Sequence, residues 1–306
     1  MTRHYLDHAS TSPLRPESAA AMAEALTGIV GDPGRIHHEG MVARHAVETA
    51  RQQVADMLDA RGREVVFTSG ATESIAMACW GASRRDGRRH SVMSAVEHSA
   101  VRRQADRGPC TVVGVDRTGR VDPDEIMAGV TDDTGIVHLQ LANHEVGTVH
   151  DVATVAHACR QRDVLCHVDA AAAVGQVAVS FRDLGCDLMS VSAHKFGGPP
   201  GIGALLVRRG LRLDPLLLGG EQERARRAGL ENVPAVVGFG AAAAALDPER
   251  LAAESLEATR RTDLLRSGLA SMDGIQAHGH PVERLPHLVC VSIADIEPQG
   301  VLLGLD

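Results

Sequence analysis

The sequence predicts an α/β protein in which a mainly parallel β-sheet is wound by helices. Short apolar runs of strand length alternate with helix-length segments along most of the chain, which is typical of β-α-β units. Aromatic residues make up only 2% of the 306 residues. The core must therefore be aliphatic and rich in alanine, which favours parallel strands covered by helices. With 44% hydrophobic residues, the chain is long enough and apolar enough to bury a large core.

The predicted elements follow in a regular order. A short apolar run and a polar turn over residues 5–13 precede two helices, predicted at residues 16–26 and 38–58. In the second helix, apolar residues recur at helical spacing, at Val42, Ala46, Ala50 and Val54. Strands are then predicted at residues 64–68, 90–95, 111–115, 135–141, 164–168, 187–192 and 203–208, with helices at residues 71–83, 99–107, 122–130, 152–162 and 233–245.

A long polar helix, predicted at residues 248–272, leads to a second and smaller unit. Short strands at residues 275–277 and 287–293 and a helix at residues 298–306 complete the predicted elements. We expect a large domain over residues 1–245 and a partial small α/β C-terminal domain over residues 246–306. The small domain is expected to be incomplete, because the sequence stops inside its predicted last helix.

Composition excludes several classes of function. The net charge of −8 argues against a general nucleic-acid binder. The sequence has no apolar run long enough to span a membrane and no signal peptide, so we expect a cytoplasmic protein. The cysteines are scattered and lie mostly in apolar surroundings, which is typical of reduced core residues and not of a disulfide framework. No His and Cys group has the tight ligand spacing of a zinc site.

A lysine stands at the end of a predicted buried strand. Residues 186–191 are mostly apolar, His194 and Lys195 follow, and the next turn is rich in Gly and Pro. Burying an ammonium group is costly. Partial burial, however, lowers the pKa of a lysine and frees its amine to form a Schiff base. The alternative for Lys195 is a surface lysine after an edge strand.

A turn of small residues connects the strand at residues 64–68 to the next helix. Backbone N–H groups at a helix start, together with the hydroxyl of Thr72, form an anion site suited to one phosphate. The alternative is an ordinary capped helix. The sequence contains no P-loop and no complete GxGxxG motif, which favours a single phosphate ester over a nucleotide.

Two further polar residues follow predicted strands. Asp169 ends an apolar strand, where its carboxylate needs a positive partner; an ion pair or a helix cap is the alternative. His98 follows another strand and has an imidazole suited to stacking on a flat ring or to relaying protons, although a lone histidine is more often structural. Together with Lys195 and the helix start at Thr72, these residues suit pyridoxal phosphate. The lysine would form the Schiff base, the aspartate would keep the pyridine nitrogen protonated, and the helix start would hold the phosphate.

The sequence resembles the cysteine desulfurases of the NifS/IscS type, which belong to the class V aminotransferases and to fold type I of the pyridoxal-phosphate enzymes. The resemblance covers essentially the whole chain. It rests on the segments YLDHASTSP (5–13), FTSGATES (67–74), VEH (96–98), ANHEVGTV (142–149), HVDA (167–170), SAHKFGGPPGIGAL (192–205) and GGEQERARRAGLENV (219–233).

The resemblance implies a role for each matching residue. Lys195 would bind the cofactor covalently and later act as the proton-transfer base, with His98 stacked on the ring. Asp169 would pair with the pyridinium nitrogen. The phosphate would be bound by Thr72 with the Ala71 backbone, Ser192 and His194. The family converts L-cysteine to L-alanine and transfers the sulfur to an enzyme thiol and then to an acceptor protein, as in iron–sulfur cluster assembly. Its members are homodimers.

Three residues depart from the family pattern. His144 replaces an Asn that touches the cofactor, and its ring still offers a hydrogen-bond donor, so it stays a cofactor-binding candidate. Ala172 replaces a Gln and cannot donate. Leu230 replaces a Thr that reaches the partner subunit's phosphate in the family. Arg224, Arg226 and Arg227 either face an anionic ligand or are surface charges.

The family's nucleophilic cysteine loop and the arginine that binds the substrate carboxylate lie beyond the end of this sequence, so the chain is expected to be C-terminally truncated. Cys290 is expected at a core strand position. The thiol and the arginine would then come from a missing segment, a companion polypeptide or a free thiol. Two alternatives stay open. One is another class V reaction, such as elimination, racemisation or transamination, and the other is a non-catalytic truncated partner in a dimer.

Overall fold

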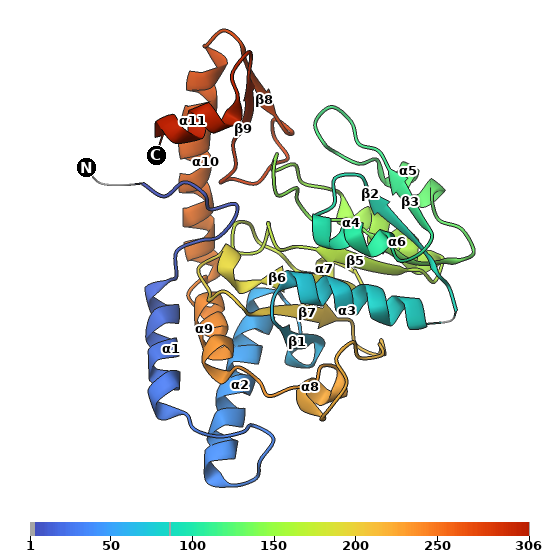
Figure 1. Ribbon diagram of the computed structural model, residues 1–306, viewed down its shortest axis with the longest axis vertical. Coiled ribbons are helices and arrows are strands. Elements are labelled where there is room, and N and C mark those ends of the chain that lie inside the picture. Colours follow the sequence, from blue (N-terminus) through green and yellow to red (C-terminus); the bar gives the residue numbers. More distant parts are fainter. Residues whose placement is uncertain (1–3, 86, 306) are drawn as a thin grey trace.

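A computed structural model describes residues 4–85 and 87–305 and shows a twisted sheet with helices on both faces (Figure 1). Seven strands form the main sheet in the order β1-β7-β6-β5-β4-β2-β3. They are β1 (Val65–Thr68), β2 (His90–Ser94), β3 (Cys110–Val113), β4 (Thr134–His138), β5 (Leu165–Asp169), β6 (Leu188–Ser192) and β7 (Gly203–Val207).

The prediction of a mainly parallel sheet is confirmed. Strands β3, β2, β4, β5 and β6 run parallel, and β7 runs antiparallel to both β6 and β1. The reversal at β7 follows from the short connection after β6, which contains no crossover helix and turns back through a Gly- and Pro-rich loop. Every residue of β5, β6 and β7 is buried.

Helices cover the sheet on both faces. On one face, α2 (His38–Met57), α6 (Val152–Gln161) and α9 (Val233–Ala244) contribute to the larger core cluster, and α9 also packs against α1 (Pro16–Gly28). On the other face, α3 (Ala71–Arg84) packs on apolar side chains of β1, β4, β5, β6 and β7. The remaining helices here are α4 (Ser99–Ala105), α5 (Pro123–Ala128), α7 (Phe181–Leu184) and α8 (Gln222–Ala225); α7 and α8 are not predicted by the sequence pattern.

The buried face of α2 is slightly different from the predicted one. The buried apolar residues are Ala43, Val47, Ala50, Val54 and Ala55, whereas Val42 is 40% exposed. A strict spacing of four residues drifts around a helix of 3.6 residues per turn. From Ala43 to Val54, the apolar residues of α2 that face the core are therefore spaced alternately by four and three residues.

The C-terminal part begins with α10 (Pro248–Ala270), which extends from the α9 region to a small antiparallel pair, β8 (Ile275–His278) and β9 (Cys290–Ile293) (Figure 1). Helix α11 (Pro298–Leu305) follows. Strand β9 begins at Cys290, three residues later than predicted from residue 287. Residues 283–285 bond to residues 147–149 of the large part, through Val149 N to Glu283 O (2.9 Å) and Leu285 N to Gly147 O (2.8 Å). The division at residue 245 stays a prediction.

No described helix is both long enough and apolar enough to cross a membrane. The six cysteines are all free. Cys159, Cys166 and Cys186 are buried, while Cys79, Cys110 and Cys290 are half-buried. The core position expected for Cys290 is not reached, because this residue is only half-buried at the start of β9, in the two-stranded sheet.

Candidate functional site

A cavity of about 510 Å³ lies at the carboxyl ends of the parallel strands, where ligands bind in wound α/β sheets. Strands β5 and β6 end at Asp169 and Ser192, and both residues line it. The structure brings all of the predicted site residues together around this cavity: Ala71, Thr72, His98, His144, Asp169, Ser192, His194 and Lys195. Their individual roles stay predictions.

Lys195 is the only lysine in the sequence; all other residues in the Lys and Arg total of 31 are arginines. A single lysine in the whole sequence is itself a signal for a functional residue, independent of the motif around it. The side chain is half-buried, and burial lowers the pKa of its amine, against the charges of Asp169 and Asp7. A lowered pKa increases the uncharged fraction, which is the form that attacks a carbonyl. The alternative of an exposed surface lysine is therefore wrong.

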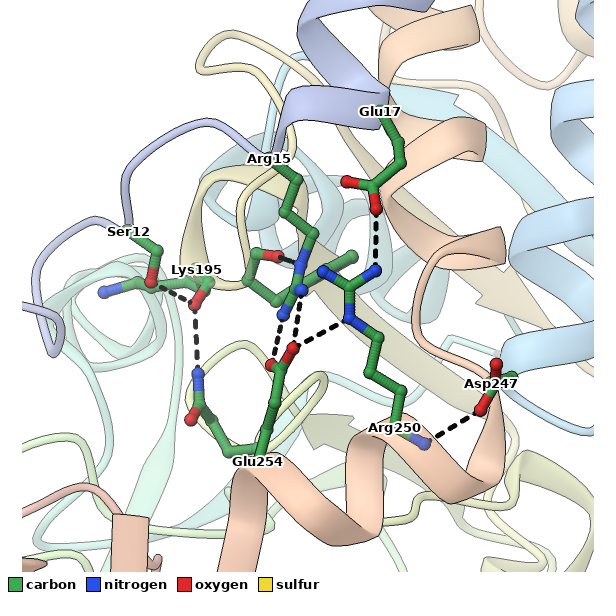
Figure 2. A network of polar contacts seen from close by, with 9 residues as sticks. Ser12, Arg15, Glu17, Lys195, Asp247, Arg250 and Glu254 are labelled. Carbon is green, nitrogen blue, oxygen red and sulfur yellow. Dashed lines mark hydrogen bonds and ion pairs between the residues drawn. The ribbon is translucent and has the colours of Figure 1, made fainter. Parts of the chain in front are cut away.

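A segment that the sequence analysis did not assign to the site holds Lys195 in place. We call residues 9–15 the N-terminal strap. The Lys195 Nζ donates a hydrogen bond to the carbonyl of Ala9 (2.5 Å), and Ser12 Oγ donates to the Lys195 carbonyl (2.9 Å), as Figure 2 shows for Ser12. Ser12 N also donates to the His194 carbonyl (2.8 Å). Most of these contacts use main-chain atoms, which leave no motif in the sequence.

Asp169 is 7% exposed at the end of β5. Its Oδ1 accepts a hydrogen bond from Ala171 N (3.0 Å). Burial raises the pKa of its carboxyl, and that hydrogen bond together with the charges of His98, His144 and Lys195 opposes the rise. A cationic ring nitrogen placed beside Asp169 would favour the ionised carboxylate.

The turn between β1 and α3, where an anion site is predicted, has an uncapped helix start. The first N–H groups of a helix have no acceptor within it, and no side chain caps α3 at Gly70. Gly70 has φ +150°, a conformation that other residues rarely adopt. Strand β7 packs directly against this turn, because a Cβ on Gly203 would lie 2.7 Å from the Cα of Gly70. Ser192 Oγ and His194 Nδ1 lie 2.9 Å apart and line the same cavity.

An ion pair fixes this turn from outside. Glu73 accepts a hydrogen bond from Ser69 N (2.7 Å) through one oxygen and from Arg227 Nε (2.9 Å) through the other. Arg224 pairs with Glu48 (2.8 Å), and Arg226 donates to the Arg63 carbonyl (3.1 Å). Each of the three arginines therefore has a partner within the chain. Arg227 supports the anion site through Glu73.

Two histidines meet at the wall of the cavity. The rings of His98 and His144 have centroids 5.0 Å apart and are inclined by 71°. His98 Nδ1 accepts a hydrogen bond from Ala100 N (3.1 Å), so a neutral His98 carries its proton on Nε2. Burial, followed by the charge of His98, lowers the pKa of His144. Ala172 lies in the same cavity, whereas Leu230 is 62% exposed.

A buried carboxyl behind this wall was not predicted. Glu97 is 3% exposed; its Oε1 accepts a hydrogen bond from Gln140 N (2.8 Å), and its Oε2 has no partner among the described residues. Burial raises the pKa of Glu97 to about 8, and the charge of Asp169 adds to the rise. Gln140 lines the cavity. The sequence gives no signal for this group, since a glutamate beside a histidine usually lies at a surface.

The residues present fit pyridoxal phosphate. An amine with a lowered pKa, a buried carboxyl, an uncapped helix start and an imidazole ring face one cavity of about 510 Å³. No group of three or more His, Cys, Asp or Glu side chains in the described residues is arranged to hold a metal ion.

Comparisons relate the chain to known proteins. The family described as Aminotransferase class-V matches residues 4–306. The chain is 38% identical to the cysteine desulfurase IscS of Methanosarcina thermophila, over 99% of this chain and 76% of that protein. Among solved structures, a NifS-like protein aligns with a TM-score of 0.90 and 32% identity, over 98% of this chain and 84% of that one. The structure of SspA in complex with cysteine aligns with a TM-score of 0.88 and 25% identity, over 99% of this chain and 87% of that one.

Proposed function

Because this chain belongs to the class V aminotransferase family and resembles its cysteine desulfurases of the NifS/IscS type, we propose that it converts L-cysteine to L-alanine with pyridoxal phosphate and passes the sulfur to a thiol. The observation that carries the proposal is the half-buried amine of Lys195 in one cavity with Asp169 and the start of α3. The structure of SspA with cysteine supports cysteine as the substrate.

Each residue of the cavity has a defined task in this proposal. Lys195 would hold the cofactor covalently, and the start of α3 with Ser192 would bind its phosphate. Asp169 would keep the ring nitrogen protonated, with His98 against the ring and His144 beside it. When bound, pyridoxal phosphate supplies an electron sink that weakens the Cα–H bond of an amino acid. The amine of Lys195 would also act as the base that takes the Cα proton of the substrate and returns it later.

The sulfur step needs groups that the cavity does not contain. None of the six cysteines and no arginine lines it in the part of the chain that the structure describes. Burial raises the pKa of the Cys290 thiol, and the charge of Glu145 adds to this, which makes it a poor nucleophile. We propose that the accepting thiol and the carboxylate-binding arginine belong to a further segment, a companion polypeptide or, for the thiol, a free acceptor. We also propose a cytoplasmic homodimer, on the family resemblance.

The single lysine makes a direct test possible. Purified protein is incubated with pyridoxal phosphate, reduced with borohydride and digested for mass spectrometry. We expect the phosphopyridoxyl group on Lys195, and none on Lys195→Ala beyond reaction at the chain's N-terminal amine. Alanine and sulfide are then measured after addition of L-cysteine and a small thiol. Cofactor on Lys195 without alanine or sulfide would contradict the desulfurase reaction and favour another class V reaction. Absence of the adduct would contradict the cofactor itself.

A further inference from the structure

The main chain after β6 is held by the N-terminal strap at successive carbonyl groups. Ser12 donates hydrogen bonds to the carbonyls of His194 and Lys195. Arg15 donates to the carbonyls of the two residues that follow. Arg15 Nε donates to the Phe196 carbonyl (2.8 Å), and Arg15 N donates to the Gly197 carbonyl (2.8 Å). The peptide units around Lys195 are therefore fixed by residues about 180 positions away in the sequence.

The Arg15 side chain is itself fixed by α10. Its two terminal nitrogens donate to the two carboxylate oxygens of Glu254 (2.9 and 2.6 Å), and its side chain is 14% exposed (Figure 2). Only an arginine supplies a rigid fork to a carboxylate and a further donor in the same plane. Gly197 allows the approach, because a Cβ there would lie 2.5 Å from Arg15 Cγ. The bond from Arg15 is the largest cause of the lowered pKa of Glu254.

A second arginine fixes Glu254. Arg250 Nε donates to Glu254 (3.0 Å), and Arg250 Nη1 donates to Glu17 of α1 (2.7 Å), as drawn in Figure 2. The start of α10 is capped by Asp247, which accepts a hydrogen bond from Arg250 N (2.8 Å). The carboxylate of Glu254 thus has a defined position between the guanidinium groups of Arg15 and Arg250. Because α10 leads to β8 and β9, the contact connects the C-terminal part to the Lys195 loop.

From this geometry we propose that Arg15 is a positioning residue for Lys195, and that Glu254 sets the position of Arg15. The inference rests on the proposed function, in which Lys195 carries the cofactor. Arg15 does not touch the amine. It fixes the peptides that follow Lys195, and so holds the main chain that carries the amine at the wall of the cavity before the cofactor arrives. Loss of such a fixed geometry slows the reaction of the amine with the cofactor aldehyde.

The test measures how fast the cofactor-free protein forms the borohydride-reducible adduct at Lys195. We expect Arg15→Ala to slow adduct formation about tenfold, and Arg15→Gln to restore little of it, since an amide cannot bond to both Phe196 and Glu254. Neither change adds a lysine, so Lys195 stays the only side-chain amine. Glu254→Gln is expected to give a similar slowing, and the double variant no more than Arg15→Ala alone.

The matched control is Glu257→Gln. Glu257 lies on the same helix and pairs only with Arg260 and Arg261 among the described residues, so we expect it to leave the rate unchanged. A second readout is the pH midpoint of the visible absorbance of the bound cofactor, which we expect to shift in Arg15→Ala and not in Glu257→Gln. A merely structural contact would lower the melting temperature without moving that midpoint.

The outcomes separate this inference from the proposed function. Wild-type protein that forms no adduct contradicts the proposed function, and with it the role of Arg15. Normal wild-type uptake, with rates and absorbance midpoints in Arg15→Ala and Glu254→Gln equal to those of Glu257→Gln, overturns the positioning role alone. If adduct formation is slower in Arg15→Ala but not in Glu254→Gln, then Glu254 of α10 does not set the position of Arg15.

Discussion

The amine of Lys195 donates a hydrogen bond to the main-chain carbonyl of Ala9, which lies 186 residues earlier in the sequence. This bond turns the amine toward the N-terminal strap and leaves it beside the cavity that also contains Asp169. The strap therefore contacts the amine itself as well as the main chain that carries it.

The pH dependence of cofactor uptake tests the environment of Lys195. Burial lowers the pKa of this amine, and only the uncharged amine attacks an aldehyde. The rate should therefore fall as the pH drops through the lowered pKa, and its midpoint should lie below the value of about 10.4 for an exposed lysine. Rates of adduct formation from pH 6 to pH 11 give this midpoint. A midpoint at or above the exposed value would contradict the burial argument.

Gly203→Ala should damage the anion site. A Cβ at residue 203 would lie 2.5 Å from the Val191 carbonyl oxygen and 2.7 Å from the Cα of Gly70. Both neighbours are main-chain atoms of the site and cannot move aside separately, so we expect a loss of about 1–3 kcal/mol of stability together with weaker cofactor binding. Urea unfolding and cofactor titration measure the two effects.

The matched control for this change is Gly268→Ala in α10, where an added Cβ meets nothing within 4 Å. This control should gain up to about 1 kcal/mol from helix propensity and should bind the cofactor normally. Unchanged cofactor binding in Gly203→Ala would show that the turn at Gly70 does not hold the phosphate.

Glu97 should make the cofactor-free protein less stable as the pH rises. Burial raises the pKa of Glu97 to about 8, from 4.5 for an exposed glutamate. The folded protein therefore binds more protons than the unfolded chain between these values. Stability contributed by the neutral carboxyl is present below pH 4.5 and is lost as the pH rises toward 8. Glu97→Gln, which cannot ionise, should lack this part of the pH dependence.

The measurement for Glu97 is the free energy of unfolding of wild type and Glu97→Gln at several pH values from 5 to 9. The difference between the two proteins should change in favour of the Gln variant as the pH rises. A difference that stays constant over this range would mean that Glu97 is not a buried neutral acid.

Removal of one member of the buried Arg51–Glu223 pair should strongly destabilise the fold. Arg51 is 3% exposed and Glu223 5% exposed. The guanidinium donates to both carboxylate oxygens (2.6 and 2.7 Å), and Phe67 N also donates to Glu223 (2.8 Å). Glu223→Gln leaves the buried charge of Arg51 without its buried partner and with only the more exposed Glu48 (3.0 Å) as an ion pair, so we expect a loss of about 3–5 kcal/mol.

The exposed pair of Arg260 with Glu257 provides the comparison, because water screens its attraction and its loss should have little effect on stability. Chemical denaturation of Glu223→Gln and Arg260→Ala measures both values. Equal effects of the two changes would contradict the argument from burial. Glu223→Gln is also expected to make residues 223–225 more mobile. These residues all have positive φ, and the Arg51–Glu223 pair holds them in that conformation.

Much of this protein follows from its sequence. The alternation of strands and helices determines the wound sheet, and each predicted element is present with its ends shifted by a few residues. Asp169 and Lys195 meet at one cavity because carboxyl ends of neighbouring parallel strands share one edge of the sheet. The order and lengths of the predicted strands and helices are enough to infer that both residues lie at this edge, since the geometry of β-α-β units is local and regular.

Tertiary structure alone decided what surrounds these residues. The contacts of Ala9, Ser12 and Arg15 with residues 194–197 mostly involve main-chain oxygens, and any residue type carries such an oxygen. Likewise, the sequence around Glu97 and Glu223 is typical of surface carboxylates, and only the structure shows that both are buried. Local patterns record which face of a helix or strand is apolar. They do not record which distant segment covers that face. The contacts with distant segments determine the direction of the Lys195 side chain and the charge of its neighbours.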